Sequence, residues 1–373
     1  MLRRLFGPLL LLALAGCASV PDVVGPPDPD DQPIPPPIVL DDELASGADG
    51  ITYGVFYSRL GNESWVAHHN SDKHFVQATV VRPDGPLVAR LPVSEAARHF
   101  DAAVHQGKLL FAYETDHIVH VGTWNGIEWT DVALPTVPMA LRTGSLRIAA
   151  NDEVAILSYH GIGAGGLMQQ VVDLTNYQEG TVPLARQFPA TGLSLQFGLT
   201  VMGDRFQLLY ASKANELSFI DATFLEAFPQ VVYSSADTIG LSGVEAAFLF
   251  QNPLSRELDA FRYTIPLLGN GPGNFLEVER ATPGVWAWEP LGIKLTSSIT
   301  DAFNFGNDTM LLADDREMYN LSSTKTMPQL ACDVLLPDSL EGEFLVTKPG
   351  AVPRLELRKE NLWSSDCVAP GTG

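Results

Sequence analysis

The sequence predicts an all-β protein, and three observations support this fold class. A short apolar strand pattern recurs along the 373-residue chain, turn-forming dipeptides separate the strands, and no long amphipathic helix pattern follows Glu43. Strand groups that recur every 40–50 residues or so are typical of β-propeller blades. We therefore expect an all-β fold, a β-propeller of six or seven four-stranded blades.

The amino-acid composition is that of a folded, strongly acidic protein. The chain is 46% hydrophobic and 18% charged, and its 23 Lys and Arg residues are outnumbered by 44 Asp and Glu residues, for a net charge of −21. Such a surface repels phosphate backbones, so we do not expect nucleic acid as a partner. Three cysteines are too few for a disulfide-dense small domain.

Residues 1–16 have the features of a secretory signal peptide. Two arginines precede an apolar stretch that is too short to span a bilayer. The sequence Leu14-Ala15-Gly16-Cys17 then resembles the lipobox of bacterial lipoproteins. This resemblance implies cleavage before Cys17 and lipid attachment to Cys17, with palmitate among the acyl chains. Because Ala18 is not Asp, the same resemblance favours the outer membrane as the anchoring site in a Gram-negative cell.

Residues 17–43 are expected to be the lipidated cysteine and an extended tether. The stretch from Ala18 to Glu43 contains eight prolines, seven acidic residues and no basic residue. Proline cannot donate a backbone hydrogen bond, and like charges extend the chain. A proline-rich docking motif is the alternative interpretation. Residues 44–373 are then expected to form a single β-propeller domain.

The strand pattern occurs seven times after the tether. Its copies end at Tyr57, Tyr113, Tyr159, Tyr210, Phe250, Leu312 and Val346. The mean step is about 48 residues, within the range of propeller blades. The individual steps vary widely, so insertions or a miscounted copy are expected, and the number of blades stays at six or seven.

One blade can be predicted in full from its turn residues. Four strands are expected at 99–105, 107–113, 118–124 and 128–133. Gln106-Gly107, Thr115-Asp116 and Asn125-Gly126 are the expected turns, and Asn-Gly between apolar runs is the strongest short hairpin signal. The alternative for the first strand is an amphipathic helix from Ser94 to a Gly107 stop.

This predicted blade also carries a family resemblance. The stretch from Ala102 to Tyr113, followed by Trp124-Asn125-Gly126-Ile127-Glu128-Trp129, resembles a blade of the sialidase-like β-propellers. The resemblance implies a propeller from about Asp49 to Trp363, and glycoside hydrolysis as one activity of the family. Many such domains occur in bacterial surface proteins without a known activity. Asn125 stands where the sialidase Asp-box has Asp, so no catalytic residue is assigned.

Two cysteines are left once Cys17 carries the lipid. An exported protein meets an oxidising compartment, so we expect Cys332 and Cys367 to form a disulfide that fastens the C-terminal tail to the final blade. Two separate buried thiols are the alternative.

Several residue clusters were weighed as functional sites. All eight histidines lie between His68 and His160, but no spacing matches a metal-binding motif, so blade histidines are preferred to a metal site. No cofactor is expected. The Gly161–Gly166 run is interpreted as a blade loop rather than a nucleotide site. Packing is preferred to sugar stacking for the tryptophan pairs, which are Trp124 with Trp129 and Trp286 with Trp288.

Together these observations predict a lipoprotein of the cell envelope that binds rather than catalyses. Its propeller is expected to act as a binding or scaffold domain, with a protein or glycan ligand at the propeller face. Its other partner is the membrane, through the N-terminal lipid. A sialidase-like glycoside hydrolase and a structural subunit of an outer-membrane assembly are the two alternatives.

Overall fold

The computed structural model describes the folded part of the chain in a series of ranges. These are residues 36–41, 55–60, 62–70, 75–93, 98–116, 118–134, 140–163, 165–178, 181–190, 197–213, 216–234, 242–251, 258–266, 276–295, 299–305, 308–313, 318–321, 325–326, 333–335, 343–348, 354–359 and 367. They all belong to one compact unit that begins at Pro36. Within these ranges no helix has the length and hydropathy that a membrane crossing requires.

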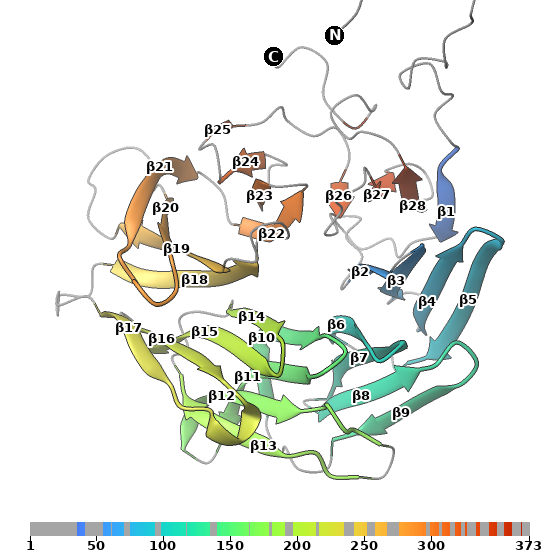
Figure 1. Cartoon of the computed structure of the whole chain (residues 1–373), viewed down its shortest axis with the longest axis horizontal. Helices are drawn as coiled ribbons and strands as arrows, with labels where there is room; N and C mark the ends of the chain where they lie inside the picture. The colour runs from blue at the N-terminus through green and yellow to red at the C-terminus, as the bar shows by residue number, and fades with distance from the viewer. Residues whose placement is uncertain are drawn as a thin grey trace, which may run out of the picture. The chain divides into compact units, whose positions relative to one another are not determined.

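The described strands form seven four-stranded antiparallel sheets, the blades of a β-propeller (Figure 1). Blade 1 contains β2 (Val55–Leu60), β3 (Glu63–Asn70), β4 (Phe75–Arg82) and β5 (Gly85–Pro92). Blade 2 contains β6 (Arg98–His105), β7 (Lys108–Thr115), β8 (Ile118–Trp124) and β9 (Trp129–Ala133). Blade 3 contains β10 (Ala140–Ala150), β11 (Ala155–Gly163), β12 (Gly166–Asp173) and β13 (Ala185–Pro189).

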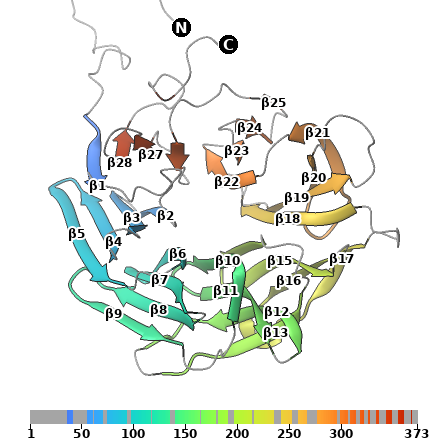
Figure 2. The ribbon, with the colours of Figure 1, turned by 180° about the vertical axis from the view of Figure 1, so that it is seen from behind.

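The remaining blades follow in chain order (Figure 2). Blade 4 contains β14 (Gly198–Met202), β15 (Arg205–Lys213), β16 (Glu216–Ala222) and β17 (Gln230–Ser234). Blade 5 contains β18 (Ser242–Gln251), β19 (Leu258–Pro266), β20 (Leu276–Ala281) and β21 (Glu289–Leu295). Blade 6 contains β22 (Ile299–Phe305), β23 (Asp308–Ala313), β24 (Met318–Asn320) and β25 (Lys325–Thr326). Blade 7 contains β26 (Asp333–Leu335), β27 (Glu343–Lys348), β28 (Arg354–Lys359) and β1 (Ile38–Asp41).

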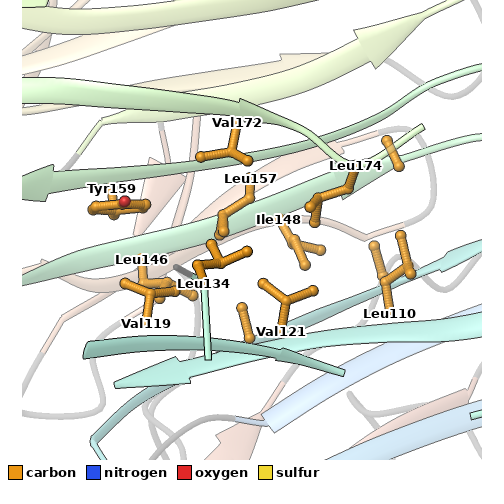
Figure 3. Close-up of a cluster of buried hydrophobic side chains, with 13 residues drawn as sticks. Leu110, Val119, Val121, Leu134, Leu146, Ile148, Leu157, Tyr159, Val172 and Leu174 are labelled. Atoms are coloured by element: carbon orange, nitrogen blue, oxygen red, sulfur yellow. The ribbon is translucent and has the colours of Figure 1, made fainter. Parts of the chain in front are cut away.

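The hydrophobic core lies between neighbouring blades rather than inside one sheet. Alternate side chains of each strand point to opposite faces, so a blade packs against both of its neighbours. Figure 3 shows the junction of blades 2 and 3, where Val121 of β8 lies near Leu157 of β11 and Ile148 of β10. The first strands of blades 1 to 6 contact one another in succession, which makes them the inner strands of the propeller.

The structure confirms the predicted blade at residues 99–133. The four strands of blade 2 match the predicted ones to within two residues at every boundary. Four of the predicted turn residues have positive φ, as their turns require: Gln106 (49°), Gly107 (71°), Asp116 (52°) and Gly126 (92°). The helix alternative from Ser94 to Gly107 is wrong, because β6 occupies Arg98–His105 and pairs with β7.

The structure also explains the uneven repeat. Tyr57 and Phe250 lie on first strands, β2 and β18, whereas the other five copies end on second strands. The equivalent second strands of those two blades are β3 and β19. Both strands of such a hairpin carry apolar residues, so the sequence pattern selected the wrong member of the pair in two blades. The blade count is seven.

Blade 7 combines the two ends of the folded chain. β1 pairs antiparallel with β28, so that Ile38 lies opposite Leu357 and Asp41 opposite Leu355. The predicted boundary between tether and propeller at residues 43 and 44 is therefore corrected: the folded unit begins at Pro36. The sequence hid this strand because its four residues follow three prolines and precede further acids.

A buried hydrogen-bond network joins this closing strand to blade 1. Asp41 is 2% exposed, and its Oδ2 accepts hydrogen bonds from His68 Nε2 (2.9 Å) and Asn70 Nδ2 (3.1 Å) of β3. Gln77 Nε2 of β4 donates to the backbone oxygen of Leu40 (2.7 Å). Leu40 itself packs in the apolar cluster of this junction. The carboxylate therefore links the last blade to the first across a dry interface.

We predict that Asp41→Ala lowers the free energy of unfolding by about 2–4 kcal/mol, because two buried donors lose their shared acceptor. Urea unfolding followed by tryptophan fluorescence measures this difference. Asp84→Ala is the matched control, since Asp84 is an exposed turn residue of blade 1. Equal stability losses in the two variants would contradict a special role for the buried carboxylate.

Candidate functional site

The connections between strands divide each blade into two ends. Because neighbouring strands are antiparallel, the first-to-second and third-to-fourth connections share one end, here called the turn end. Side chains tie the turn ends of successive blades together. Gln106 Nε2 of blade 2 donates to the Asp152 oxygen of blade 3 (3.3 Å), and Asn151 Nδ2 donates to the Gly203 oxygen of blade 4 (2.9 Å). The turn ends of blades 2, 3 and 4 are therefore neighbours.

The most exposed large apolar side chains of the described residues all lie at the turn end. Seven of them are more than half exposed: Val231 (53%) lies near the start of β17, and the other six, which we call the apolar rim, stand in third-to-fourth connections. The apolar rim consists of Ile127 (87%), Val182 (58%), Leu184 (57%), Leu225 (72%), Phe228 (84%) and Val285 (75%). They come from four consecutive blades, 2 to 5. Turns usually carry polar residues, so this placement marks a surface for contact.

The backbone of the rim is held in place locally. In blade 2, Asn125 Oδ1 accepts hydrogen bonds from the backbone N–H groups of Ile127 and Glu128, both at 2.9 Å. This Asx-type turn fixes the loop and directs Ile127 outward. A side chain presented by a rigid loop loses little conformational entropy on binding, which favours recognition.

A second anchor holds the rim residues of blade 4. The connection contains the 3-10 helix η2 (Phe224–Glu226), whose Phe224 is buried against blades 3 and 4. Arg186 of β13 donates to the backbone oxygens of Ala227 (2.8 Å) and Leu225, and its guanidinium lies over the Phe224 ring. Blade 3 therefore clamps this connection from the side, and Leu225 and Phe228 are left exposed.

Blade 5 holds its rim residue with two tryptophans. Trp286 packs edge-on against Phe219 of β16, with ring centroids 4.7 Å apart, and Trp288 Nε1 donates to the Val232 oxygen (3.3 Å). The interpretation of these tryptophans as packing residues agrees with these contacts. Trp124, 1% exposed, is likewise a core residue stacked on Trp129. Val285 next to Trp286 stays 75% exposed.

A polar group of three side chains lies on the face of blade 2 that meets blade 1. Tyr113 Oη donates to Asp131 Oδ2, and His120 Nδ1 lies 3.8 Å from Asp131 Oδ1. The His120 ring stacks on the Tyr113 ring with centroids 4.9 Å apart. Burial raises the pKa of the Asp131 carboxyl, an effect that the Tyr113 hydroxyl and His120 partly oppose. Burial also raises the pKa of Tyr113.

Only some of the predicted site residues lie in the part of the chain that the structure describes. Cys17 and Cys332 lie outside the described residues. Cys367 is completely buried and disulfide-bonded, but its pairing with Cys332 stays a prediction. The Gly161–Gly166 run forms the end of the β11–β12 hairpin, where Gly163 pairs with Gly166.

The histidines do not act as one group. His68 belongs to the closing network, whereas the ring nitrogens of His105 contact the backbone oxygens of Asn151 and Thr175 and His120 lies beside Asp131. Within the described ranges, no three His, Cys, Asp or Glu side chains are placed to hold a metal ion.

Six arginines are engaged by partners within or beside their own blade, spread over five blades. Their partners are Glu63 for Arg82, Gln77 for Arg90, the blade 4 backbone for Arg186, Asp221 for Arg205, Asp259 for Arg280 and Glu356 for Arg358. The ion pairs of Arg82, Arg205 and Arg280 join neighbouring strands, whereas Arg358 and Glu356 lie on the same strand, β28.

Sequence reasoning missed the apolar rim. Each rim residue is an ordinary apolar residue in the chain, and only its exposure distinguishes it from a core residue. The signal that could have found it is the combination of Asn-Gly-Ile-Glu at 125–128 with Phe-Leu-Glu-Ala-Phe at 224–228. Both place apolar residues beside a carboxylate within a turn.

We predict that Tyr113→Phe lowers the free energy of unfolding by about 1–2 kcal/mol, because the buried Asp131 carboxylate loses a donor. The hydroxyl lowers the pKa of Asp131, so it favours the ionised carboxylate. The loss is therefore expected to be larger at neutral pH than at acid pH. Denaturant unfolding at both pH values measures it.

Tyr159→Phe is the matched control for this prediction. Tyr159 is also buried on a second strand, but its hydroxyl has no hydrogen-bond partner among the described residues. Removing that hydroxyl is expected to leave stability unchanged or to raise it slightly. A loss in Tyr159→Phe as large as that in Tyr113→Phe would contradict the assignment.

Comparison with known proteins concerns the fold. No family model and no curated protein matches the chain. A solved structure of the mitotic checkpoint complex contains a chain with 12% identity and a TM-score of 0.52, with 95% of this chain and 100% of that chain covered. An Aleuria aurantia lectin bound to Fucα1-6GlcNAc has 12% identity, coverage of 89% and 100%, and a TM-score of 0.43. An oligogalacturonate lyase in complex with manganese has 11% identity, coverage of 85% and 98%, and a TM-score of 0.46. At these identities, the likeness extends to the β-propeller architecture alone.

Proposed function

We propose that this protein is a lipoprotein of the cell envelope whose β-propeller binds a protein partner through its turn end and does not catalyse a reaction. The observation that carries the proposal is the apolar rim, in which the six most exposed large apolar side chains gather in the third-to-fourth connections of blades 2 to 5. Protein interfaces are built around apolar side chains held rigidly and surrounded by polar groups. The rim has both properties.

The direction of the closing strand supports a role close to the membrane. β1 runs antiparallel to β28, so Ile38 lies beside the end of β28 that belongs to the turn end of blade 7. A tether that ends at Pro36 would join the propeller at the same end as the apolar rim. The lipid proposed at Cys17 would then keep this surface within a tether length of the bilayer, where envelope proteins are concentrated.

Two features support binding over glycoside hydrolysis. The six paired arginines are spread over five blades, and each already neutralises or caps a neighbouring group. The buried Asp131 carboxylate is held by Tyr113 and lies beside His120 in its own blade. These side chains stabilise blades, which is a structural use of residues that a hydrolase would need in its site.

For the lipid anchor, we predict that Cys17→Ser abolishes incorporation of labelled palmitate and releases the protein from the membrane fraction. The thiol of Cys17 is the expected acceptor, and more than one acyl chain is needed for stable anchoring. Metabolic labelling followed by membrane fractionation measures both effects. Cys332→Ser is the control and should retain the label. Persistent labelling in Cys17→Ser would reject the anchor.

For the partner, we predict that a photo-crosslinking amino acid at Phe228 forms a discrete adduct with an envelope protein in cells. The same probe at Ile118 should give none, because Ile118 is 46% exposed but lies at the opposite end of its blade. Mass-resolved immunoblotting compares the two positions. Adducts at Ile118 alone would reject the turn end as the interface. Glycan-array binding that survives Phe228→Ser would support a glycan ligand instead.

A further inference from the structure

The apolar rim is accompanied by carboxylates and by no basic residue in the same connections. In blades 1 to 5, the described residues of the turn-end connections include six exposed acids and neither Lys nor Arg. These acids are Asp84, Glu128, Asp152, Glu153, Asp204 and Glu226. The basic residues nearest in the chain belong to the adjoining strands, and one of them, Arg205, is already paired with Asp221 (2.9 Å). The described turn-end connections of blades 1 to 5 are therefore apolar and carry only negative charge, with Lys108 and Arg205 at the starts of the adjoining strands β7 and β15.

Acid and apolar side chains alternate within single rigid loops. Glu128 follows Ile127 in the turn that Asn125 holds, and both side chains are exposed. Glu226 stands between Leu225 and Phe228 in the connection that Arg186 clamps. Each loop thus presents one carboxylate beside an apolar contact in a fixed arrangement. A partner that buries the apolar side chain must meet the neighbouring charge.

This combination selects the chemistry of the partner. A lipid bilayer with anionic headgroups, like a nucleic acid, is repelled by clustered carboxylates. A polypeptide with Lys or Arg among apolar side chains satisfies both features, since complementary charges orient it and apolar contacts hold it. We infer that the turn end of blades 2 to 4 binds a cationic amphipathic segment of a protein. This inference rests on the proposed binding function and adds the charge and the class of the partner.

The test uses two peptides of identical spacing, one of Leu and Lys and one of Leu and Glu, each labelled with a fluorophore. The full chain carrying Cys17→Ser allows the measurement without detergent, and fluorescence anisotropy gives the affinities. The Leu/Lys peptide is expected to bind, with an affinity that falls as salt rises, and the Leu/Glu peptide is not. Equal binding of both peptides overturns the inference.

Paired variants separate charge from apolar contact. Glu128→Gln with Glu226→Gln is expected to weaken Leu/Lys binding about fivefold, and Leu225→Ser with Phe228→Ser at least about tenfold. Asp116→Asn with Glu216→Gln removes the same charge at the opposite end, where Asp116 lies between β7 and β8 and Glu216, paired with Lys213, is the first residue of β16. This control should bind like the parent chain. A matching loss in the control shows attraction to net charge alone and overturns the inference.

The outcomes distinguish this inference from the proposed function. If the glutamine pair binds normally, the serine pair loses the peptide and the probe placed at position 228 of the parent chain forms its crosslink, the binding function stands and the charge assignment falls. If the serine pair keeps the peptide and Phe228 gives no crosslink, the proposed function itself fails. Flotation of the Cys17→Ser chain with phosphatidylcholine vesicles that is lost in the serine pair overturns the inference in favour of a lipid surface.

Discussion

The whole ring depends on the pairing of one four-residue strand, β1, with β28. Without β1, blade 7 would have three strands, its edge would move to β28, and Leu40 would leave the apolar cluster that joins blade 7 to blade 1. Hydrophobic contact alone would tolerate a shifted strand. Asp41 does not, because a buried carboxylate is costly unless its donors are in place, and His68 and Asn70 provide them from blade 1 only in this register.

Closure gives every blade the same orientation, and this symmetry places the turn connections, with the apolar rim, at one end of the propeller. Residues as distant in the chain as Ile127 and Val285 occupy equivalent connections and so belong to the same end of the propeller. Local anchors such as Asn125 and Arg186 then hold the loops rigid. The strands position the loops, and the side chains of the loops are the groups that can contact a partner, as is common in proteins that carry function on loops.

The blades repeat their packing but not their polar contacts. Tyr113, Tyr159 and Tyr210 each lie on the second strand of a blade, are buried, and have a pKa raised mainly by burial. Their hydroxyls differ. The Tyr113 hydroxyl donates to Asp131, the Tyr159 hydroxyl has no hydrogen-bond partner among the described residues, and the Tyr210 hydroxyl is hydrogen-bonded to Ser218. Apolar packing is thus the shared requirement, and the polar partner varies from blade to blade.

The sequence by itself determined the fold class and nearly all of blade 2, because alternation and turn residues such as Asn125-Gly126 act over a few residues. The lipobox-like pattern that ends at Cys17 is equally local, and lipid attachment there stays a prediction. Only the tertiary structure decided the number of blades, the closing strand and the apolar rim. Ile38–Asp41 becomes a strand because β28 comes from the other end of the chain to pair with it. Likewise, an apolar residue such as Phe228 differs from a core phenylalanine only in its exposure, and exposure is a property of the folded assembly of blades.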